Sequence, residues 1–253
     1  MLCTPIGMML MAGAQDLLVF FVGLELLSIP LYALASFRRN RVRSVEAGVK
    51  YFLLGAFAAA FFLYGAALVY ADTGTIALAG LRAHGVATPL AGAGVALMMA
   101  SLFFKVSVFP FHLWVPDVYE GSPTPVTALM ATGTKAAAFA FLFNAAFMLP
   151  SSAAITLAVI ALVTMALGNL GALVQTDVKR MLAYSGIAHA GTVLLVVAAW
   201  LALGAQGVAE DLRRDAVHAA LFYLGAYVFT AAGSFGLLAL LERGGARTRV
   251  EDL

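Results

Sequence analysis

The stretch FKVSVFPFHLWVPD, residues 104–117, places a lysine, a histidine and two prolines in a largely apolar run that ends at Asp117. Pro110 and Pro116 each remove a backbone donor, so either one disturbs a regular helix. Such a break at membrane depth is tolerated where the backbone is buried in protein or lines a wet cavity. The stretch therefore predicts a broken membrane helix near Pro110, with Lys105 and His112 beside the break.

The composition outside this stretch is that of a membrane protein. Of the 253 residues, 63% are hydrophobic and 11% are charged, whereas a soluble surface is about a quarter charged. The net charge is only +2 and the basic residues are scattered, so we expect no nucleic-acid binding. Cys3 is the single cysteine, which excludes an internal disulfide and a cysteine-ligated iron–sulfur site. We expect no metal and no cofactor on this chain.

Apolar windows of roughly twenty residues, the length that crosses a bilayer core, predict the helices. The predicted full crossings are 17–37, 45–70, 89–114, 125–148, 153–174, 180–202 and 216–241. Residues 1–13 are also apolar but too short, and we expect them to be the tail of a further helix. The predicted fold is an all-α polytopic membrane protein with about seven full transmembrane helices and a partial N-terminal one.

Lysines and arginines fall mainly in alternate loops, which indicates the orientation. One side holds nine of them: Arg38, Arg39, Arg41, Arg43, Lys179, Arg180, Arg243, Arg247 and Arg249. The opposite side holds Arg82, Arg213 and Arg214. The first side is therefore predicted to be cytoplasmic. The three remaining basic residues, Lys50, Lys105 and Lys135, stand inside apolar segments.

Ionisable groups inside apolar segments are the candidate functional residues, because each costs at least ~3 kcal/mol at the centre of a spanning helix. Lys105 and Lys135 lie roughly half a bilayer core from the nearest polar loop. Glu25 lies inside another apolar segment and could pair with a lysine of a neighbouring helix. Lys50 follows Glu46 by four residues, so the two can pair on one helix face or Lys50 can reach the headgroups.

These isolated charges suit a proton relay better than an ion pore, which would use rings of one sign. Burial disfavours the charged form of a group and a nearby opposite charge favours it. A buried lysine whose carboxylate partner approaches and withdraws therefore takes up and releases protons. His112 either relays protons near neutral pH or is an interfacial histidine beside Trp114.

Three longer motifs carry a resemblance to a known family. They are PFHLWVPDVYEGSPTPVTALMATGTKAAAF (residues 110–139), DVKRMLAYSGIAHAG (177–191) and LELLSIPLYAL (24–34). The sequence resembles the antiporter-like membrane subunits of respiratory complex I, and is most similar to subunit N of bacterial proton-pumping NADH:quinone oxidoreductase. The alternatives are a subunit of an Mrp-type cation/proton antiporter and a non-pumping scaffold fragment.

The resemblance implies a fold of inverted repeats and a role for each buried charge. Residues 1–148 would form most of the first repeat and 153–253 part of the second, in a single transmembrane domain. Glu25 and Lys105 match a glutamate–lysine pair, and Lys135 matches a lysine that passes protons along a central hydrophilic axis.

The remaining matches are weaker. Glu46 and Lys50 match a second pair, and His112 matches a histidine at the helix break. His189 matches a position on the tenth helix; it could equally be a packing residue whose nitrogens Tyr184 and Ser185 satisfy. Gly186 stands where the family more often has a serine.

The resemblance also implies the cellular setting. NADH and quinone would be used by other subunits of the complex, with no redox centre in this chain. The partners would be the other membrane-arm subunits and the lipid of a bacterial inner membrane. We expect the chain to begin within the fourth helix of the family and to end before the twelfth, and so to carry one proton half-channel.

Overall fold

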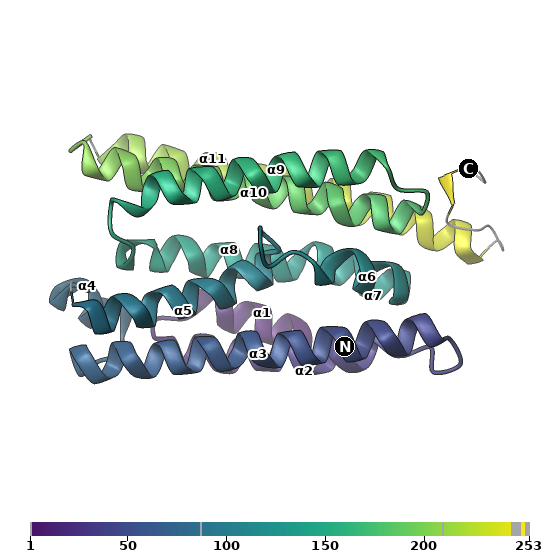
Figure 1. Cartoon of the computed structure of the whole chain (residues 1–253), viewed down its shortest axis with the longest axis horizontal. Coiled ribbons are helices and arrows are strands. Elements are labelled where there is room, and N and C mark those ends of the chain that lie inside the picture. Colours follow the sequence, from purple (N-terminus) through teal and green to yellow (C-terminus); the bar gives the residue numbers. More distant parts are fainter. Residues whose placement is uncertain (1, 87, 209, 244–248, 251–253) are drawn as a thin grey trace.

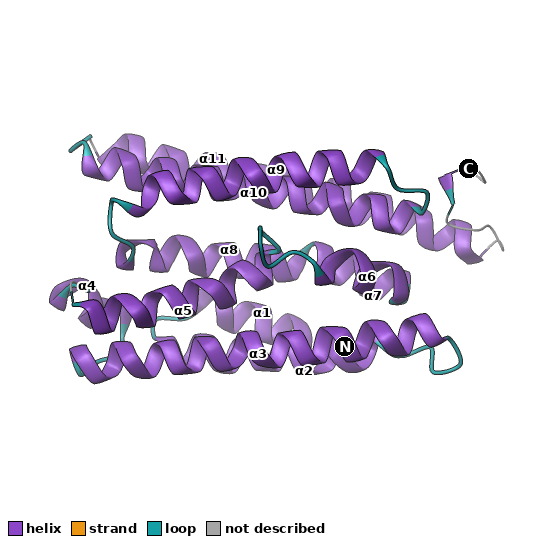
Figure 2. Cartoon of the chain, viewed as in Figure 1, coloured by secondary structure: helices purple, strands orange, loops and turns teal. Residues whose placement is uncertain are grey.

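The computed structural model describes residues 2–86, 88–208, 210–243 and 249–250, which are almost entirely helical (Figure 2). The helices are α1 (Cys3–Gly13), α2 (Leu17–Ala35), α3 (Val42–Thr73), α4 (Leu78–His84), α5 (Pro89–Val106), α6 (Trp114–Gly121), α7 (Thr124–Ala131), α8 (Gly133–Ala145), the 3₁₀ turn η1 (Ala146–Met148), α9 (Ala153–Leu173), α10 (Val178–Ala205) and α11 (Glu210–Arg243). The all-α prediction is confirmed.

Seven helical segments are long and apolar enough to cross a membrane, as predicted. They are Leu17–Ala35, Val42–Thr73, Pro89–Val106, Thr124–Met148, Ala153–Leu173, Val178–Ala205 and Glu210–Arg243. The helix Cys3–Gly13 is apolar but shorter, in agreement with the partial N-terminal helix expected from the sequence.

The helices form three layers (Figure 1). Helices α1–α3 make one outer layer and α9–α11 the other, with α5–α8 between them. In an apolar 18-residue window of each helix, 61% is buried in Pro89–Val106 and in Thr124–Met148 of the middle layer. The outer layer that holds α9–α11 ranges from 56% in Val178–Ala205 to 22% in Glu210–Arg243. Lys105 and Lys135 belong to the middle layer, so packing removes both from lipid.

Glycines set the spacing between the layers and within them. A Cβ atom on Gly94 of α5 would lie 2.6 Å from the carbonyl oxygen of Gly65 on α3. A Cβ atom on Gly168 of α9 would lie 2.5 Å from the backbone nitrogen of Ala188 on α10. Small residues let membrane helices approach closely where no hydrophobic effect drives association, and at these two positions a side chain does not fit.

The predicted break near Pro110 is confirmed, but it begins earlier than the predicted crossing 89–114 allowed. Helix α5 ends at Val106, and Ser107 has a left-handed backbone with φ of 70°. Pro110 disfavours a helical conformation at the residue before it, which stops α5 from continuing. The backbone N–H of Phe109 donates to Thr164 Oγ1 of α9 at 3.0 Å, so a neighbouring helix satisfies a group that the break exposes.

A second break, at Thr132, lies within the predicted crossing 125–148 and was not predicted from the sequence. Thr132, with φ −104° and ψ −81°, separates α7 from α8. Its hydroxyl donates to the Ala128 carbonyl at 2.8 Å, and the Thr134 hydroxyl donates to the Met130 carbonyl at 2.5 Å. Hydroxyls that bond carbonyls one turn back bend helices, and Gly133 adds backbone freedom. The break places Lys135 in the first turn of α8.

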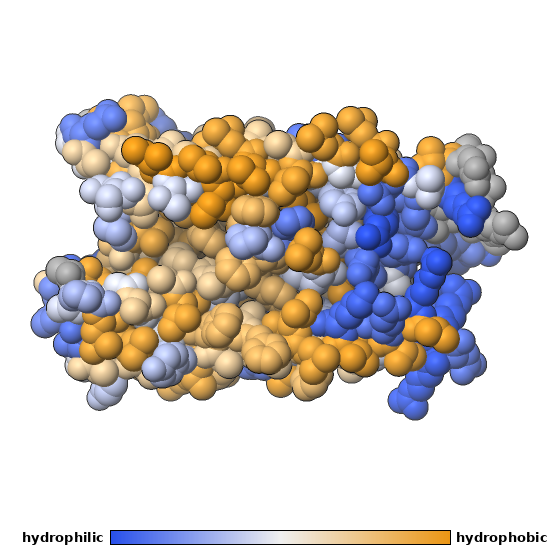
Figure 3. All heavy atoms as spheres, viewed as in Figure 1, coloured by the Kyte–Doolittle hydropathy of each residue, from blue (hydrophilic) through white to orange (hydrophobic). Residues whose placement is uncertain are grey.

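Charged side chains gather at one end of the bundle, on the right in Figure 3. There Arg43 of α3 contacts Glu120 of α6 at 2.7 Å, and Glu120 also contacts Arg180 of α10 at 3.1 Å. These ion pairs join the start of α3 to the start of α10, as the alternation of basic loops predicted. The cytoplasmic orientation of this end remains a prediction, and Arg247 lies outside the described residues.

Candidate functional site: two buried lysines of the middle layer

Lys105 lies in the last turn of α5 with 4% of its surface exposed. Its Nζ atom donates hydrogen bonds to the Ser28 hydroxyl of α2 at 2.8 Å and to the Tyr51 hydroxyl of α3 at 3.2 Å. The break that follows α5 leaves Lys105 at the end of its helix, facing α2 and α3. Both hydrogen-bond partners are neutral hydroxyl groups.

Glu25 lies one turn before Ser28 on α2 and lines the same small cavity as Lys105. No ion pair within 4.0 Å joins Glu25 to Lys105 among the described residues, and the buried Oε1 atom of Glu25 has no hydrogen-bond partner there. The cavity offers about 10 Å³ to the centre of a water molecule, which is close to the room one water needs. The structure thus brings the predicted pair together without direct contact.

Lys135 is the second buried lysine, with 2% of its surface exposed. Its Nζ atom donates to the Gly186 carbonyl of α10 at 2.7 Å and lies 5.9 Å from the ring centre of Tyr227 on α11. A Cβ atom on Gly186 would be 2.9 Å from Lys135 Nζ and 3.0 Å from the Tyr227 hydroxyl. The glycine therefore lets the lysine reach the α10 backbone beside a tyrosine.

His189 lies on α10 three residues after Gly186, near Lys135. Its Nδ1 atom is 2.6 Å from the Tyr223 hydroxyl of α11, and its ring centre is 4.9 Å from that of Tyr227. Tyr184 and Ser185 were the alternative partners for the ring nitrogens, but Nδ1 is partnered by Tyr223 of α11 instead. Lys135, His189 and two tyrosines thus form one cluster between α8, α10 and α11.

His112 lies in the turn between α5 and α6 and is buried, with 8% exposed. Its Nδ1 atom has no hydrogen-bond partner among the described residues. The structure gives it a ring contact with Phe109, at 6.0 Å between ring centres, and no hydrogen bond to Lys105 in the described part of the chain. Its role in a relay remains a prediction.

Lys50 and Glu46 make the expected contact, at 2.6 Å, but in a setting that differs from the one predicted. Lys50 Nζ also contacts Asp117 of α6 at 2.8 Å, and 41% of the Lys50 side chain is exposed. Asp117 in turn binds Arg180 at 2.7 Å. Lys50 therefore belongs to the charged end of the bundle rather than to its apolar interior, and the role of the pair remains a prediction.

The pKa of Asp117 depends on its two cationic neighbours, Lys50 and Arg180. Partial burial raises the pKa of its carboxyl group, but hydrogen bonds and charge from Lys50 and Arg180 outweigh burial and leave the pKa below its ordinary value. Asp117 was not among the residues predicted from the sequence. The sequence feature that could have identified Asp117 is its place directly after Pro116, at the polar end of the broken helix.

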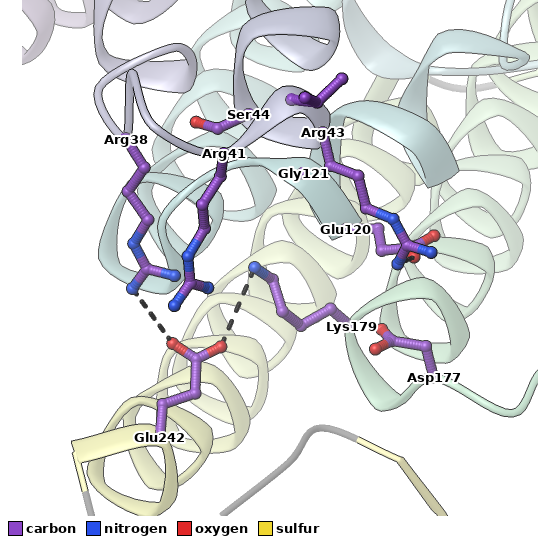
Figure 4. Close-up of a pocket in the computed structure, with 10 residues that line it drawn as sticks. Arg38, Arg41, Arg43, Ser44, Glu120, Gly121, Asp177, Lys179 and Glu242 are labelled. Carbon is purple, nitrogen blue, oxygen red and sulfur yellow. Dashed lines mark hydrogen bonds and ion pairs between the residues drawn. The ribbon is translucent and has the colours of Figure 1, made fainter. Parts of the chain in front are cut away.

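Lys179 is the third fully buried lysine, although the sequence assigned it to a polar loop. It lies in the first turn of α10 with 3% exposed, donates to the Ser122 carbonyl at 2.5 Å and lies 4.0 Å from Glu242 of α11. Glu242 also contacts Arg38 at 3.5 Å and accepts from the Thr124 hydroxyl at 2.7 Å. Figure 4 shows Arg38, Lys179 and Glu242 beside a cavity of about 350 Å³.

We use two names below. The interior lysines are Lys105 and Lys135. The charged-end network is Arg38, Arg43, Glu46, Lys50, Asp117, Glu120, Lys179, Arg180 and Glu242. Within the described residues no group of three or more His, Cys, Asp or Glu side chains is arranged to hold a metal ion. The interior site therefore offers amines, imidazoles, hydroxyls and one carboxyl group, which are proton-carrying groups.

Comparison with known proteins agrees with this chemistry. The family model described as NADH:quinone oxidoreductase/Mrp antiporter, transmembrane, matches residues 14–251. The NADH-quinone oxidoreductase subunit N of Trichlorobacter lovleyi is 45% identical over 255 residues, covering 96% of this chain and 50% of that protein. The chain thus spans about half the length of the curated relatives it matches.

Solved structures give the same picture. A chain of respiratory complex I from Thermus thermophilus is 43% identical with a TM-score of 0.76, over 94% of this chain and 50% of that one. A chain of the Mrp complex from Dietzia sp. DQ12-45-1b is 26% identical with a TM-score of 0.83, over 95% and 44%. The fold is common to both assemblies, whereas sequence identity is higher to the complex I chain. This protein therefore belongs to the NADH:quinone oxidoreductase/Mrp antiporter transmembrane family, and its sequence is similar to subunit N.

Proposed function

We propose that this chain is a proton-translocating part of the membrane arm of a NADH:quinone oxidoreductase in a bacterial inner membrane. Electron transfer from NADH to quinone takes place in other subunits, and the chain moves protons through its interior lysines. The similarity to subunit N supports the choice of complex. The fold suits an Mrp-type antiporter as well, with a TM-score of 0.83 against 0.76, so the choice rests on the higher sequence identity to the complex I chain, 43% against 26%.

The observation that carries the proposal is the set of partners of the interior lysines. Lys105 contacts two hydroxyls and Lys135 contacts one backbone carbonyl. No carboxylate lies within 4.0 Å of either amine among the described residues. A buried ammonium group without a paired anion is costly, whereas a neutral amine there is cheap. Both amines can therefore exchange protons with small changes around them.

Glu25 is the group that shifts the protonation equilibrium of Lys105. If the carboxylate moves within contact of the amine, it favours the protonated lysine, and when it withdraws the lysine releases the proton. The two side chains line one small cavity of about 10 Å³, in which we expect the carboxylate to approach the amine and to withdraw from it. Events in the redox subunits would bias that movement.

Lys135 and His189 then receive the proton. Lys135 lies at the break of the α7–α8 segment, where irregular backbone lines ion-binding positions in transporters. The imidazole of His189 and the hydroxyl of Tyr223 are 2.6 Å apart and extend the set of exchangeable groups along α10 and α11. In this scheme His112, Glu46 and Lys50 modulate the path from its charged end.

The experiment uses the assembled complex in inverted membrane vesicles. NADH-driven acidification is followed by quenching of a pH-sensitive acridine dye, together with the rate of NADH oxidation and the amount of assembled complex. Lys135→Ala should lower acidification per NADH oxidised about tenfold or more, because a relay group is removed.

The matched control is Arg43→Ala, which also removes a cation, but one whose side chain is 80% exposed. It should leave acidification within about twofold of the parent, as expected for a surface ion pair. Parental pumping by Lys135→Ala in well-assembled vesicles would falsify the relay assignment.

A further inference from the structure

Tyr119 of α6 is wholly buried, with 0% of its surface exposed. Its hydroxyl oxygen is buried as well, and no group of the described residues lies within hydrogen-bonding distance of it. Buried hydroxyls are nearly always hydrogen-bonded, and one without a protein partner calls for an explanation. A phenylalanine would keep the ring contacts without burying an unpaired polar atom.

The surroundings of Tyr119 connect it to the Lys105 site. Its ring packs edge-on against Trp114, at 6.2 Å between ring centres, and Trp114 stacks on Tyr51 at 4.7 Å. The Tyr51 hydroxyl accepts the hydrogen bond from Lys105. One side of Tyr119 therefore packs against the tryptophan that stacks on Tyr51, the tyrosine that touches Lys105.

The other side faces the Lys135 cluster. Tyr119 packs against Phe235 of α11 at 6.2 Å between ring centres, and Tyr227 lies eight residues earlier on the same buried face of α11. The ring centre of Tyr227 lies 5.9 Å from Lys135 Nζ. Tyr119 thus lies between the aromatic stack on Tyr51 and the face of α11 that carries Tyr227.

We propose that the Tyr119 hydroxyl binds water and links Lys105 to Lys135 in the proton path. This inference rests on the proposed function. A tyrosine hydroxyl both donates and accepts hydrogen bonds, so it can pass a proton on without holding a charge. Water is the only further component that the step requires.

The step balances in protons and bonds. A protonated water on the Tyr51 side gives a proton to a lone pair of the Tyr119 oxygen, forming one O–H bond. The original O–H bond of Tyr119 breaks as its proton passes to a water on the Tyr227 side. The phenol is neutral before and after, and rotation of the hydroxyl restores the starting orientation. Phenylalanine at this position has neither the proton nor the lone pair.

The test is Tyr119→Phe in the assembled complex, measured in vesicles as acidification per NADH oxidised. Because the hydroxyl has no partner among the described residues, its removal should leave folding and assembly intact, which separates a role in the path from a structural one. We expect acidification per NADH to fall about tenfold or more, because a positioned proton-transfer group contributes about 10²–10⁴-fold to a rate. The matched control is Tyr64→Phe on α3, where 62% of the side chain is exposed.

Lys135→Ala is measured in the same experiment, so that failure of the link through Tyr119 can be distinguished from failure of the proposed function. If Lys135→Ala abolishes pumping and Tyr119→Phe pumps like the parent, the link through Tyr119 is overturned and the proposed function stands. If Lys135→Ala itself pumps normally, the proposed function fails. An equal loss in Tyr119→Phe and Tyr64→Phe overturns the specific role of Tyr119.

A second measurement does not depend on activity. A high-resolution density map of the assembled complex should contain an ordered water within hydrogen-bonding distance of the Tyr119 oxygen. Tyr119→Phe should lose that water and keep the surrounding side chains in place. A dry Tyr119 hydroxyl in the parent map overturns the proposal.

Discussion

Lysines occur in two environments in this molecule, and the difference lies in their partners. Lys50 and Lys179 of the charged-end network face carboxylates: Lys50 contacts Glu46 and Asp117, and Lys179 lies 4.0 Å from Glu242. The interior lysines face neutral oxygen atoms of hydroxyl or carbonyl groups. A nearby carboxylate favours the charged form of a lysine. The lysines of the charged-end network have such a neighbour, whereas the interior lysines lack one among the described residues, as the proposed relay requires.

The contacts in the two environments also differ in the helices that they connect. The ion pairs of the charged-end network connect α3, α6, α10, α11 and the α2–α3 loop, so they brace the bundle where it meets water. The hydrogen bonds of the interior lysines hold few elements together. Their loss should affect proton movement more than stability, and loss of a network residue should do the opposite.

The largest expected difference comes from arginine substitutions in the two regions. Lys105→Arg keeps the positive charge, but a guanidinium group cannot be deprotonated in proteins. Acidification per NADH in vesicles should therefore fall about tenfold or more. Lys50→Arg should retain at least about half of the parental value, because Glu46 and Asp117 need only a cation between them.

Assembly has to be equal in both variants for this comparison, and the amount of complex in each membrane provides the check. Equal pumping by Lys105→Arg and the parent would mean that Lys105 supplies a static charge. A severe loss in Lys50→Arg would place Lys50 in the path and remove the distinction between the two regions.

A stability effect of intermediate size is expected at the end of α11. The Glu242 side chain, 18% exposed, joins α11 to Arg38, Thr124 and Lys179. Glu242→Ala should weaken the last turns of α11 by about 2 kcal/mol, the scale of hydrogen bonds to a charged group. Hydrogen exchange of the amides there should be faster by roughly 30-fold.

Glu210→Ala on the same helix is the comparison. Its side chain is 60% exposed and its one ion pair among the described residues is with Arg213, at 3.3 Å, so exchange should change by less than about twofold. Unchanged exchange in Glu242→Ala would show that the network does not brace the bundle.

The sequence predicted the membrane helices well because their signal is local. A window of apolar residues is enough to place a span, and Pro110 alone marks one break. The break at Thr132 escaped prediction because threonine and glycine are both tolerated in membrane helices. Its cause is the way that Thr132 and Thr134 bond carbonyls one turn back.

The candidate site was predictable only in part, because its contacts join residues far apart in the chain. The charge of Lys105 and Lys135 against an apolar background marked both positions. Their partners, Ser28 and Gly186, are ordinary small residues, 77 and 51 positions away. Lys179 was misassigned to a loop for the same reason, since its burial depends on helices α7 and α11.

The smallest expected effect is the pH dependence of the charged-end network. The pKa of Asp117 lies below its ordinary value of about 4, so its ionised form stabilises the fold. That contribution is complete above the pKa of the unfolded chain and is lost as the pH falls through the lower pKa of the folded state. The Asp117 side chain is 36% exposed, so we expect it to contribute only about 0.5 kcal/mol to the free energy of unfolding.

The measurement is hydrogen exchange of the α6 amides. In the parent, exchange should become faster below about pH 4. In Asp117→Asn, after correction for intrinsic exchange, it should not change with pH. Because this acid effect belongs to the network alone, a matching change near the interior lysines would show that the two regions are coupled.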